Sequence, residues 1–302
     1  MNAATDDIPH VEGVEHRFVD VGGLRVHLAE AGDPSNPPLL LLHGWPQNWY
    51  EWRRVVPLLS NEFHLLMPDL RGHGWTDAPE GPYDKERLAT DVLALLDDLG
   101  LERVSVIGHD WGGWIAFLVA LRAPDRVARM LILNVAHPFQ RPGARRLAAT
   151  WRFWYQCVLA TPWLGERLLR NGARFVHYFL TVGTVNRASL VDPELAVFAA
   201  RMREPARARA SSRLYRTFIL REFPDVAAGR YRQTRLRVPT RVLFGVRDAF
   251  ISPVWLGGFE PYADDMAVEL VEDSGHFIAE EKPELVAARA REFLGAGVPA
   301  GR

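Results

Sequence analysis

The stretch Val106-Ile107-Gly108-His109-Asp110-Trp111-Gly112-Gly113 decides the fold of this chain. An apolar run ends in a glycine, a polar residue stands at the turn, and two glycines open a helical pattern. This order is typical of the nucleophile elbow G-x-S-x-G, in which small flanking residues permit a strained turn between a strand and a helix. Asp110 stands where that motif has serine. A carboxylate attacks an alkyl carbon and becomes an ester, so this residue predicts a different reaction class from that of a serine hydrolase.

The composition is that of one large globular α/β protein, and its charge does not indicate a strongly charged binding partner. The chain has 302 residues, 48% of them hydrophobic, and a net charge of −1, so we expect no nucleic acid or membrane surface as a partner. The single Cys157 excludes an internal disulfide and offers no metal cluster. Residues 1–10 lack the apolar segment of a secretory signal, and no apolar run approaches the ~20 residues that span a bilayer. These features predict a soluble, cytoplasmic protein.

Short apolar runs alternate with helical patterns along the chain. The runs are apolar throughout rather than alternating, which is typical of parallel strands buried on both faces. The order therefore predicts an α/β fold with a mostly parallel sheet between layers of helices. The predicted strands are 24–29, 39–42, 63–67, 104–107, 128–133, 240–244 and 267–271, and the predicted helices are 49–59, 85–99, 111–122 and 283–293.

Strand patterns disappear between residues 137 and 229, where helix formers and aromatic residues dominate. Turn-forming residues, including Pro142-Gly143 and Gly229, bracket this segment. We therefore predict a core in two parts, 1–136 and 230–302, with a helical cap over 137–229 inserted between two strands. A cap placed over the carboxyl ends of the strands would cover the place where open α/β sheets bind ligands.

Three polar residues follow predicted strands in the order nucleophile, acid, histidine. Asp110 is the first, Asp248 follows the run 240–244, and His276 follows the run 267–271. This is the chain order of an α/β-hydrolase triad. Each residue alone could be an ordinary loop residue, and Asp110 could merely cap the following helix, but three in register favour a catalytic set.

A fourth element is His43-Gly44-Trp45-Pro46, directly after the run 39–42. A loop at this place supplies a backbone N–H that joins the N–H after the nucleophile as an oxyanion hole. The predicted donors are the backbone amides of Trp45 and Trp111, with both indoles lining the substrate pocket. We interpret His43 and His109 as structural residues.

The chain resembles the epoxide hydrolases of the α/β-hydrolase superfamily from about Phe18 to Leu294. The resemblance rests on His43-Gly44-Trp45-Pro46, on the aspartate elbow Gly108–Gly113 and on Gly275-His276-Phe277. It implies an eight-stranded, mostly parallel sheet with a helical cap. It also implies two cap tyrosines, which match Tyr155 in Phe153-Trp154-Tyr155-Gln156 and Tyr215 in Leu214-Tyr215-Arg216.

The resemblance implies conversion of an epoxide and water to a vicinal diol, without metal or organic cofactor. Asp110 would attack an epoxide carbon while Tyr155 and Tyr215 hydrogen-bond the ring oxygen and supply its proton. His276, oriented by Asp248, would then activate the water that opens the aspartyl ester. The alternative for each tyrosine is packing within an aromatic-rich cap. The expected partners are a small apolar epoxide and water, for a monomer or homodimer.

Two other functions compete with epoxide hydrolysis. Dehalogenases use the same aspartate, histidine and acid, and the indole of Trp111 would suit a halide. Haloalkane dehalogenases, however, have asparagine where this chain has Trp45, and fluoroacetate dehalogenases have arginines where it has Trp111 and Trp114. The acid of the fluoroacetate enzymes falls where this chain has Asn134. The second competitor is a non-catalytic ligand-binding protein on the same fold, which the complete set of Asp110, Asp248 and His276 disfavours.

Overall fold

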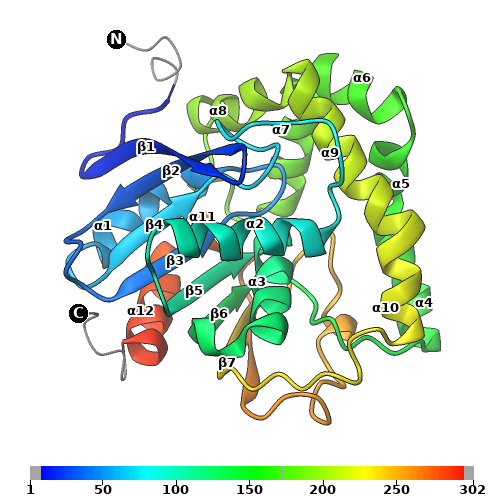
Figure 1. The fold of residues 1–302 in the computed structure, drawn as a ribbon. Helices are drawn as coiled ribbons and strands as arrows, with labels where there is room; N and C mark the ends of the chain where they lie inside the picture. Colours follow the sequence, from blue (N-terminus) through cyan, green and yellow to red (C-terminus); the bar gives the residue numbers. More distant parts are fainter. Residues whose placement is uncertain (1–7, 172, 296–302) are drawn as a thin grey trace.

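A computed structural model describes residues 8–171 and 173–295 of the chain. An eight-stranded sheet with the order β1-β2-β4-β3-β5-β6-β7-β8 lies at its centre (Figure 1). Strand β2 is antiparallel to both of its neighbours, and every other pairing is parallel. The predicted mostly parallel sheet is confirmed. The strands are β1 (Val14–Val21), β2 (Leu24–Ala31), β3 (Pro38–Leu42), β4 (His64–Pro68), β5 (Val104–His109), β6 (Val127–Leu133), β7 (Thr240–Gly245) and β8 (Met266–Val271).

Strand β1 has no counterpart among the strands predicted from apolar runs. It forms a hairpin with β2 through Gly22 and Gly23, whose φ values of 56° and 84° favour glycine. Because β1 lies at the edge of the sheet, only Val21 of its eight residues is fully buried. An edge strand needs no continuous apolar run, so its sequence gave little signal.

Helices cover both faces of the sheet. Alternate residues of β3 point to opposite sides: Leu40 and Leu42 pack with α2 and α3, whereas Leu39 and Leu41 pack with α1 and α12. The predicted helix 49–59 is wrong in one respect, since a 3₁₀ helix (η1) gives way to α1 at Pro57, which has no N–H to continue the first helix. The helices of the core are η1 (Trp49–Arg54), α1 (Val56–Leu59), α2 (Lys85–Asp98), α3 (Trp111–Arg122), η2 (Pro124–Arg126), η6 (Pro253–Trp255), α11 (Ile278–Glu281) and α12 (Pro283–Leu294).

The chain between β6 and β7 forms a helical insertion, defined here as residues 144–228, in which the described part contains no strand. In Figure 1 these helices, coloured green to yellow, stand beside and above the sheet. No helix within the described ranges has the length and hydropathy needed to cross a bilayer. The insertion comprises α4 (Ala144–Ala149), η3 (Thr150–Phe153), α5 (Trp154–Ala160), α6 (Leu164–Asn171), α7 (Ala173–Gly183), η4 (Arg187–Ser189), α8 (Asp192–Met202), α9 (Pro205–Thr217), the π-helical η5 (Phe218–Glu222) and α10 (Phe223–Ala228).

Candidate active site

Polar residues follow five neighbouring parallel strands at their carboxyl ends. Trp45 follows β3, Asp110 follows β5, Asn134 follows β6, Asp248 follows β7 and His276 follows β8. Because parallel strands end at the same edge, the sheet brings together residues that are up to 231 positions apart in the chain, from 45 to 276. The sequence analysis predicted that Asp110, Asp248 and His276 would lie at this edge.

Asp110 has the strained backbone of an elbow, with φ 48° and ψ −119°. A Cβ at Gly108 would lie 2.7 Å from the Gly113 Cα, and one at Gly112 would lie 2.1 Å from the Leu42 carbonyl oxygen. The close approach of β3, β5 and α3 therefore requires glycine at both positions. The Asp110 side chain makes no capping hydrogen bond to α3, so it does not serve as an ordinary helix cap.

The two oxygens of the Asp110 carboxylate have different surroundings. The backbone N–H of Trp45 donates to Oδ2 at 3.0 Å, whereas Oδ1 lies 4.0 Å from His276 Nε2. The Trp111 amide, the other predicted oxyanion donor, makes no hydrogen bond to this carboxylate within the described structure. One oxygen is thus held by the backbone, and the other faces the histidine without direct bonding.

The side chains of His276 and Asp248 are in direct contact. Its Nδ1 lies 2.7 Å from Asp248 Oδ2, and the backbone amides of Phe250 and Ile251 donate to Oδ1 at 2.7 and 2.9 Å. Burial alone would raise the pKa of the Asp248 carboxyl, but His276 and these hydrogen bonds lower it. The Asp248 carboxylate thus holds the His276 ring through Nδ1 and leaves Nε2 facing Asp110.

Asn134 hydrogen-bonds the Asp248 carboxylate of the pair Asp248–His276. Sequence analysis did not predict this contact. Its Nδ2 donates to Asp248 Oδ2 at 2.9 Å and to the Gly275 carbonyl at 3.1 Å, and its Oδ1 accepts the Gly245 amide at 3.3 Å. Its backbone has φ 43°. Asparagine tolerates this conformation better than most residues, and its position at the end of β6 was the signal available in the sequence.

Tyr155 and Tyr215 approach from the insertion, on α5 and α9. Both are buried, and their ring centroids lie 5.8 Å apart in an edge-to-face contact. Burial and the nearby Asp110 raise the pKa of the Tyr155 hydroxyl. Burial, Tyr155 and Asp110 raise the pKa of the Tyr215 hydroxyl. Both phenols therefore keep their protons near neutral pH, and the charge of Asp110 contributes to the raised pKa of each.

The two indoles predicted to line the site differ in their hydrogen bonding. Trp45 Nε1 donates to Ser211 Oγ at 3.2 Å, one helical turn before Tyr215 on α9. The Trp45 ring also packs edge-on against Tyr215 at 5.3 Å, so it docks α9 onto the core. Trp111 Nε1 is buried and makes no well-aligned hydrogen bond among the described residues, but its N–H is close enough to the Tyr215 hydroxyl to lower the pKa of that phenol.

Lys85, at the start of α2, was missed by sequence analysis. It is completely buried, and its Nζ donates to the Leu214 carbonyl and to Glu222 Oε2, both at 2.8 Å. The same nitrogen lies 4.4 Å from the centroid of the Trp111 ring. Burial lowers the pKa of the Lys85 ammonium, while Glu222 and Asp110 oppose this effect. Lys85 thus joins the insertion to the residue that follows Asp110.

His109 lies beside Asp110 in sequence, but its side chain serves the fold. Its Nε2 bonds the His276 carbonyl oxygen at 2.9 Å, and its Nδ1 lies 3.1 Å from Glu51. Burial would lower the pKa of His109, but Glu51 and Asp110 raise it to about 9. A charged His109 links the elbow to the loop that carries His276.

A small cavity of about 60 Å³ adjoins Asp110, Trp111 and Tyr155. Its lining is largely aromatic, and Asp110 is the one charged residue in it. The described residues hold no group of three or more His, Cys, Asp and Glu side chains suited to a metal ion. The other lining residues are Trp114, Val135, Ala136, Gln140, Phe153, Gln156, Phe218, Phe223, Val226, Ile251 and Trp255.

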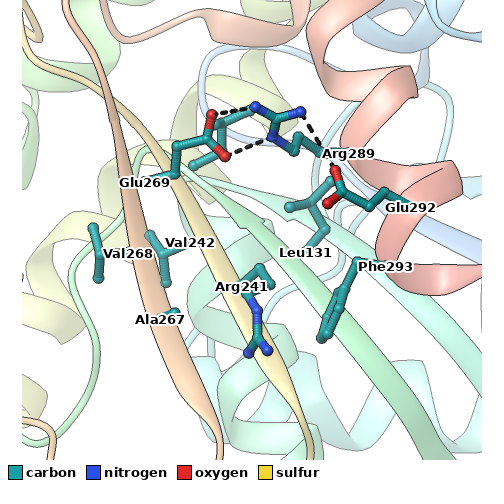
Figure 2. Close-up of a pocket in the computed structure, with 10 residues that line it drawn as sticks. Leu131, Arg241, Val242, Ala267, Val268, Glu269, Arg289, Glu292 and Phe293 are labelled. Carbon is teal, nitrogen blue, oxygen red and sulfur yellow. Dashed lines mark hydrogen bonds and ion pairs between the residues drawn. The ribbon is translucent and has the colours of Figure 1, made fainter.

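A separate hollow lies on the sheet between β7, β8 and α12 (Figure 2). Its charged side chains have partners: Arg289 contacts Glu269 at 2.6 Å and Glu292 at 3.4 Å, and Arg241 contacts Asp265 at 2.7 Å. It contains none of the five strand-end residues described above. Asp110, Trp111 and Tyr155 line the cavity at Asp110, whereas His276 and Tyr215 are not among its lining residues.

An aspartate elbow with an acid–histidine pair at the carboxyl edge of this sheet defines an α/β hydrolase. The alpha/beta hydrolase fold family matches residues 37–175 of the chain. The soluble epoxide hydrolase of Corynebacterium sp. (strain C12) is 32% identical over 292 residues, which cover 93% of this chain and 97% of the relative. Human epoxide hydrolase 4 is 29% identical over 295 residues, which cover 92% of this chain and 78% of the relative.

Solved structures agree with these relatives. The ligand-free structure of the epoxide hydrolase CorEH has a TM-score of 0.82 to this chain at 31% identity, covering 93% of this chain and 99% of that one. The chain belongs to the epoxide hydrolase family of the α/β-hydrolase superfamily, and it is a hydrolase enzyme.

Proposed function

We propose that this enzyme hydrolyses epoxides to vicinal diols through an ester on Asp110. The observation that carries the proposal is the pair of buried phenols, Tyr155 and Tyr215, whose pKa values are both raised in part by the charge of Asp110. Opening an epoxide creates an alkoxide, which needs a proton at the moment the carbon–oxygen bond breaks. Phenols that remain protonated beside a carboxylate supply that need.

In the first step, an Asp110 oxygen bonds to an epoxide carbon as the ring carbon–oxygen bond breaks. The released oxygen takes a proton from Tyr155 or Tyr215. Oδ1 is the attacking atom we assign, because the Trp45 amide already holds Oδ2 at 3.0 Å. Oδ2 then becomes the carbonyl oxygen of the ester, next to a donor that is already in place.

In the second step, water attacks the Asp110 carbonyl carbon and gives a proton to His276 Nε2. The negative charge falls on Oδ2, where the Trp45 amide donates and where we place the Trp111 amide as the second donor. Collapse breaks the bond between the Asp110 carbonyl carbon and Oδ1, so Oδ1 leaves with the substrate carbon and takes the proton from His276 to become a hydroxyl of the diol. The proton left on the carboxyl group restores the phenol, so the overall reaction adds one water to one epoxide.

The cap boundaries belong to the same proposal. We assign residues 137–229 to a cap that carries both phenols, with 1–136 and 230–302 forming the core. The bonds that Lys85 makes to Leu214 and Glu222 support a cap held on the core. The small volume of the cavity implies that cap side chains move to admit a substrate.

Dehalogenation is the second candidate, and the buried indole N–H of Trp111, which makes no well-aligned hydrogen bond among the described residues, favours it. A halide leaving group needs such a donor but needs no proton. The indole N–H of Trp45, the other indole near the nucleophile, already bonds Ser211, so a second halide donor from this position is missing. Halide release does not require a proton donor, so the phenols Tyr155 and Tyr215 would have no role in dehalogenation.

A single turnover in heavy-oxygen water tests the proposal. We expect the peptide that contains Asp110 to gain one heavy oxygen while the first diol stays unlabelled, because the nucleophile donates its own oxygen to the product. Asp110→Asn should abolish turnover, and Asp125→Asn, an exposed aspartate outside the cavity, should not. Label in the diol instead would mean direct attack by water. Turnover of haloalkanes but not of epoxides would support the dehalogenase.

A further inference from the structure

One end of the cavity at Asp110 carries polar atoms that the proposed chemistry does not use. They belong to Gln140, in the loop after β6, and to Trp255, in η6. Both residues are more than nine-tenths buried, with 6% and 7% of their surface exposed. The rest of that lining is largely aromatic, so these polar atoms stand out.

The orientation of the Gln140 amide is fixed by its partners. Its Nε2 donates to the His137 carbonyl at 2.8 Å and to the Trp255 carbonyl at 2.9 Å. Both partners are acceptors, so a flipped amide would place oxygen against oxygen. The amide atom that faces away from these two carbonyls is therefore Gln140 Oε1. It receives no hydrogen bond within the described ranges. A buried acceptor without a donor destabilises the protein unless a ligand or water supplies one.

Trp255 contributes a complementary group. Its indole Nε1 is buried and has no acceptor among the residues described. The hydrogen bond from Gln140 to the Trp255 carbonyl keeps the two residues adjacent. An unpaired acceptor and an unpaired donor thus lie on neighbouring side chains of the lining.

We propose that Gln140 and Trp255 form a subsite for a hydroxyl group of the substrate, which rests on the proposed epoxide hydrolysis. A hydroxyl donates to Gln140 Oε1 and accepts from Trp255 Nε1 at the same time. The substrate class is then an epoxide whose tail carries a neutral hydroxyl, rather than a plain hydrocarbon. A charged tail is disfavoured, because Asp110 is the one charged residue in this lining.

The position of the subsite agrees with a substrate tail. Gln140, Trp255, Phe223 and Val226 also line a surface groove of about 510 Å³ between α4, α10 and η6. The subsite therefore lies where the inner cavity meets the groove. A tail that extends from the epoxide toward solvent passes these two side chains.

Matched pairs of substrates test the subsite. Each pair is a terminal 1,2-epoxyalkane and the compound in which its terminal methyl is replaced by a hydroxyl, with chains of about four to eight carbons. In the wild type we expect kcat/KM for the hydroxyl member to exceed that of the methyl member about tenfold at one chain length, and less at shorter and longer ones. A purely apolar pocket would give the opposite preference, because it leaves the hydroxyl unpaired.

Two independent variants assign the preference to named atoms. Gln140→Leu removes the acceptor together with the two hydrogen bonds that Nε2 donates, whereas Trp255→Phe removes only an N–H that has no partner among the described residues. Each should bring the hydroxyl-to-methyl ratio to about one, and this ratio, measured within one variant, is the readout. Trp114→Phe, which removes an indole from the same lining, is the matched control and should keep the ratio.

The outcomes separate the two proposals. If neither member of any pair is hydrolysed and no ester forms on Asp110, epoxide hydrolysis itself is wrong. If both are hydrolysed at a ratio near one at every length, the subsite is wrong and epoxide hydrolysis stands. The subsite is also wrong if the preference survives in both Gln140→Leu and Trp255→Phe.

Discussion

The Lys85 ammonium lies 4.4 Å from the centroid of the Trp111 ring while it bonds Glu222 at 2.8 Å. Trp111 follows Asp110 directly, and Glu222 ends the π-helical turn of the insertion. A single buried side chain therefore connects the elbow of the core to the end of α9, which carries Tyr215, and to the π-helical turn that follows it. The insertion and the site depend on each other through this contact.

Lys85→Met should therefore destabilise the folded protein by about 3–5 kcal/mol, because it leaves the Glu222 carboxylate buried without its cation. Chemical denaturation measures the change. Lys282→Met is the matched control, since this exposed lysine pairs with Asp273 at the surface and should cost only about 0–1 kcal/mol. Equal losses in both variants would contradict the structural role of Lys85. The double variant Lys85→Met/Glu222→Gln should recover part of the loss.

Tyr155→Phe and Tyr215→Phe should each slow the formation of the ester by about 10²-fold, and the double variant should be slower still. Each substitution removes a proton donor without changing the ring. Rapid-quench measurement of ester formation separates this step from ester hydrolysis, which should change little. Tyr178→Phe is the control, because half of that tyrosine is exposed on α7. Unchanged ester formation in the double variant would remove the phenols from the mechanism.

Asp248→Asn should spare ester formation and slow ester hydrolysis by about 10³–10⁴-fold, because the His276 imidazole loses the carboxylate that orients it. Intact-protein mass spectrometry should then find the substrate mass added to the enzyme. Asn134→Ala should give a milder effect in the same direction, since it removes one of the hydrogen bonds to Asp248. An Asp248→Asn protein that never accumulates the adduct would contradict the two-step scheme.

His137 should make the protein less stable in mild acid. Its Nε2 bonds the Gly257 carbonyl and its Nδ1 accepts the Phe139 amide, so the neutral ring fits and the charged one does not. Burial lowers the pKa of His137 to about 4 from 6.5. The unfolded chain therefore binds a proton first as the pH falls, and stability is lost between about pH 6.5 and pH 4.

The corresponding measurement is the free energy of unfolding at pH 7.5 and pH 5. The wild type should lose about 2 kcal/mol from His137 over this interval. His16 and His73 act in the same direction, because burial lowers their pKa values to about 4 and about 3. His137→Phe should reduce the pH dependence by its own share. The same loss in variant and wild type would show that His137 does not titrate in this way.

The sequence predicted most of the sheet and the core of the site, because those features rest on local patterns. Mostly apolar runs marked seven strands, and the glycines around Asp110 marked the elbow, since no other residue fits where β5 passes β3 and α3. Strand β1 escaped because an edge strand is only partly buried. The predicted helix 49–59 has a continuous apolar pattern, and this pattern did not reveal that the chain divides near Pro57 into η1 and α1.

By itself the sequence determined the elbow, the chain order of Asp110, Asp248 and His276, and the reaction class that an aspartate implies. Only the tertiary structure decided which side chains stand around them. Asn134 meets Asp248 across 114 residues and Lys85 meets Glu222 across 137, and the free atoms of Gln140 and Trp255 emerge from packing. Local patterns specify strands and turns through backbone sterics and burial, whereas these partners are chosen by the way distant elements pack, which no local pattern records.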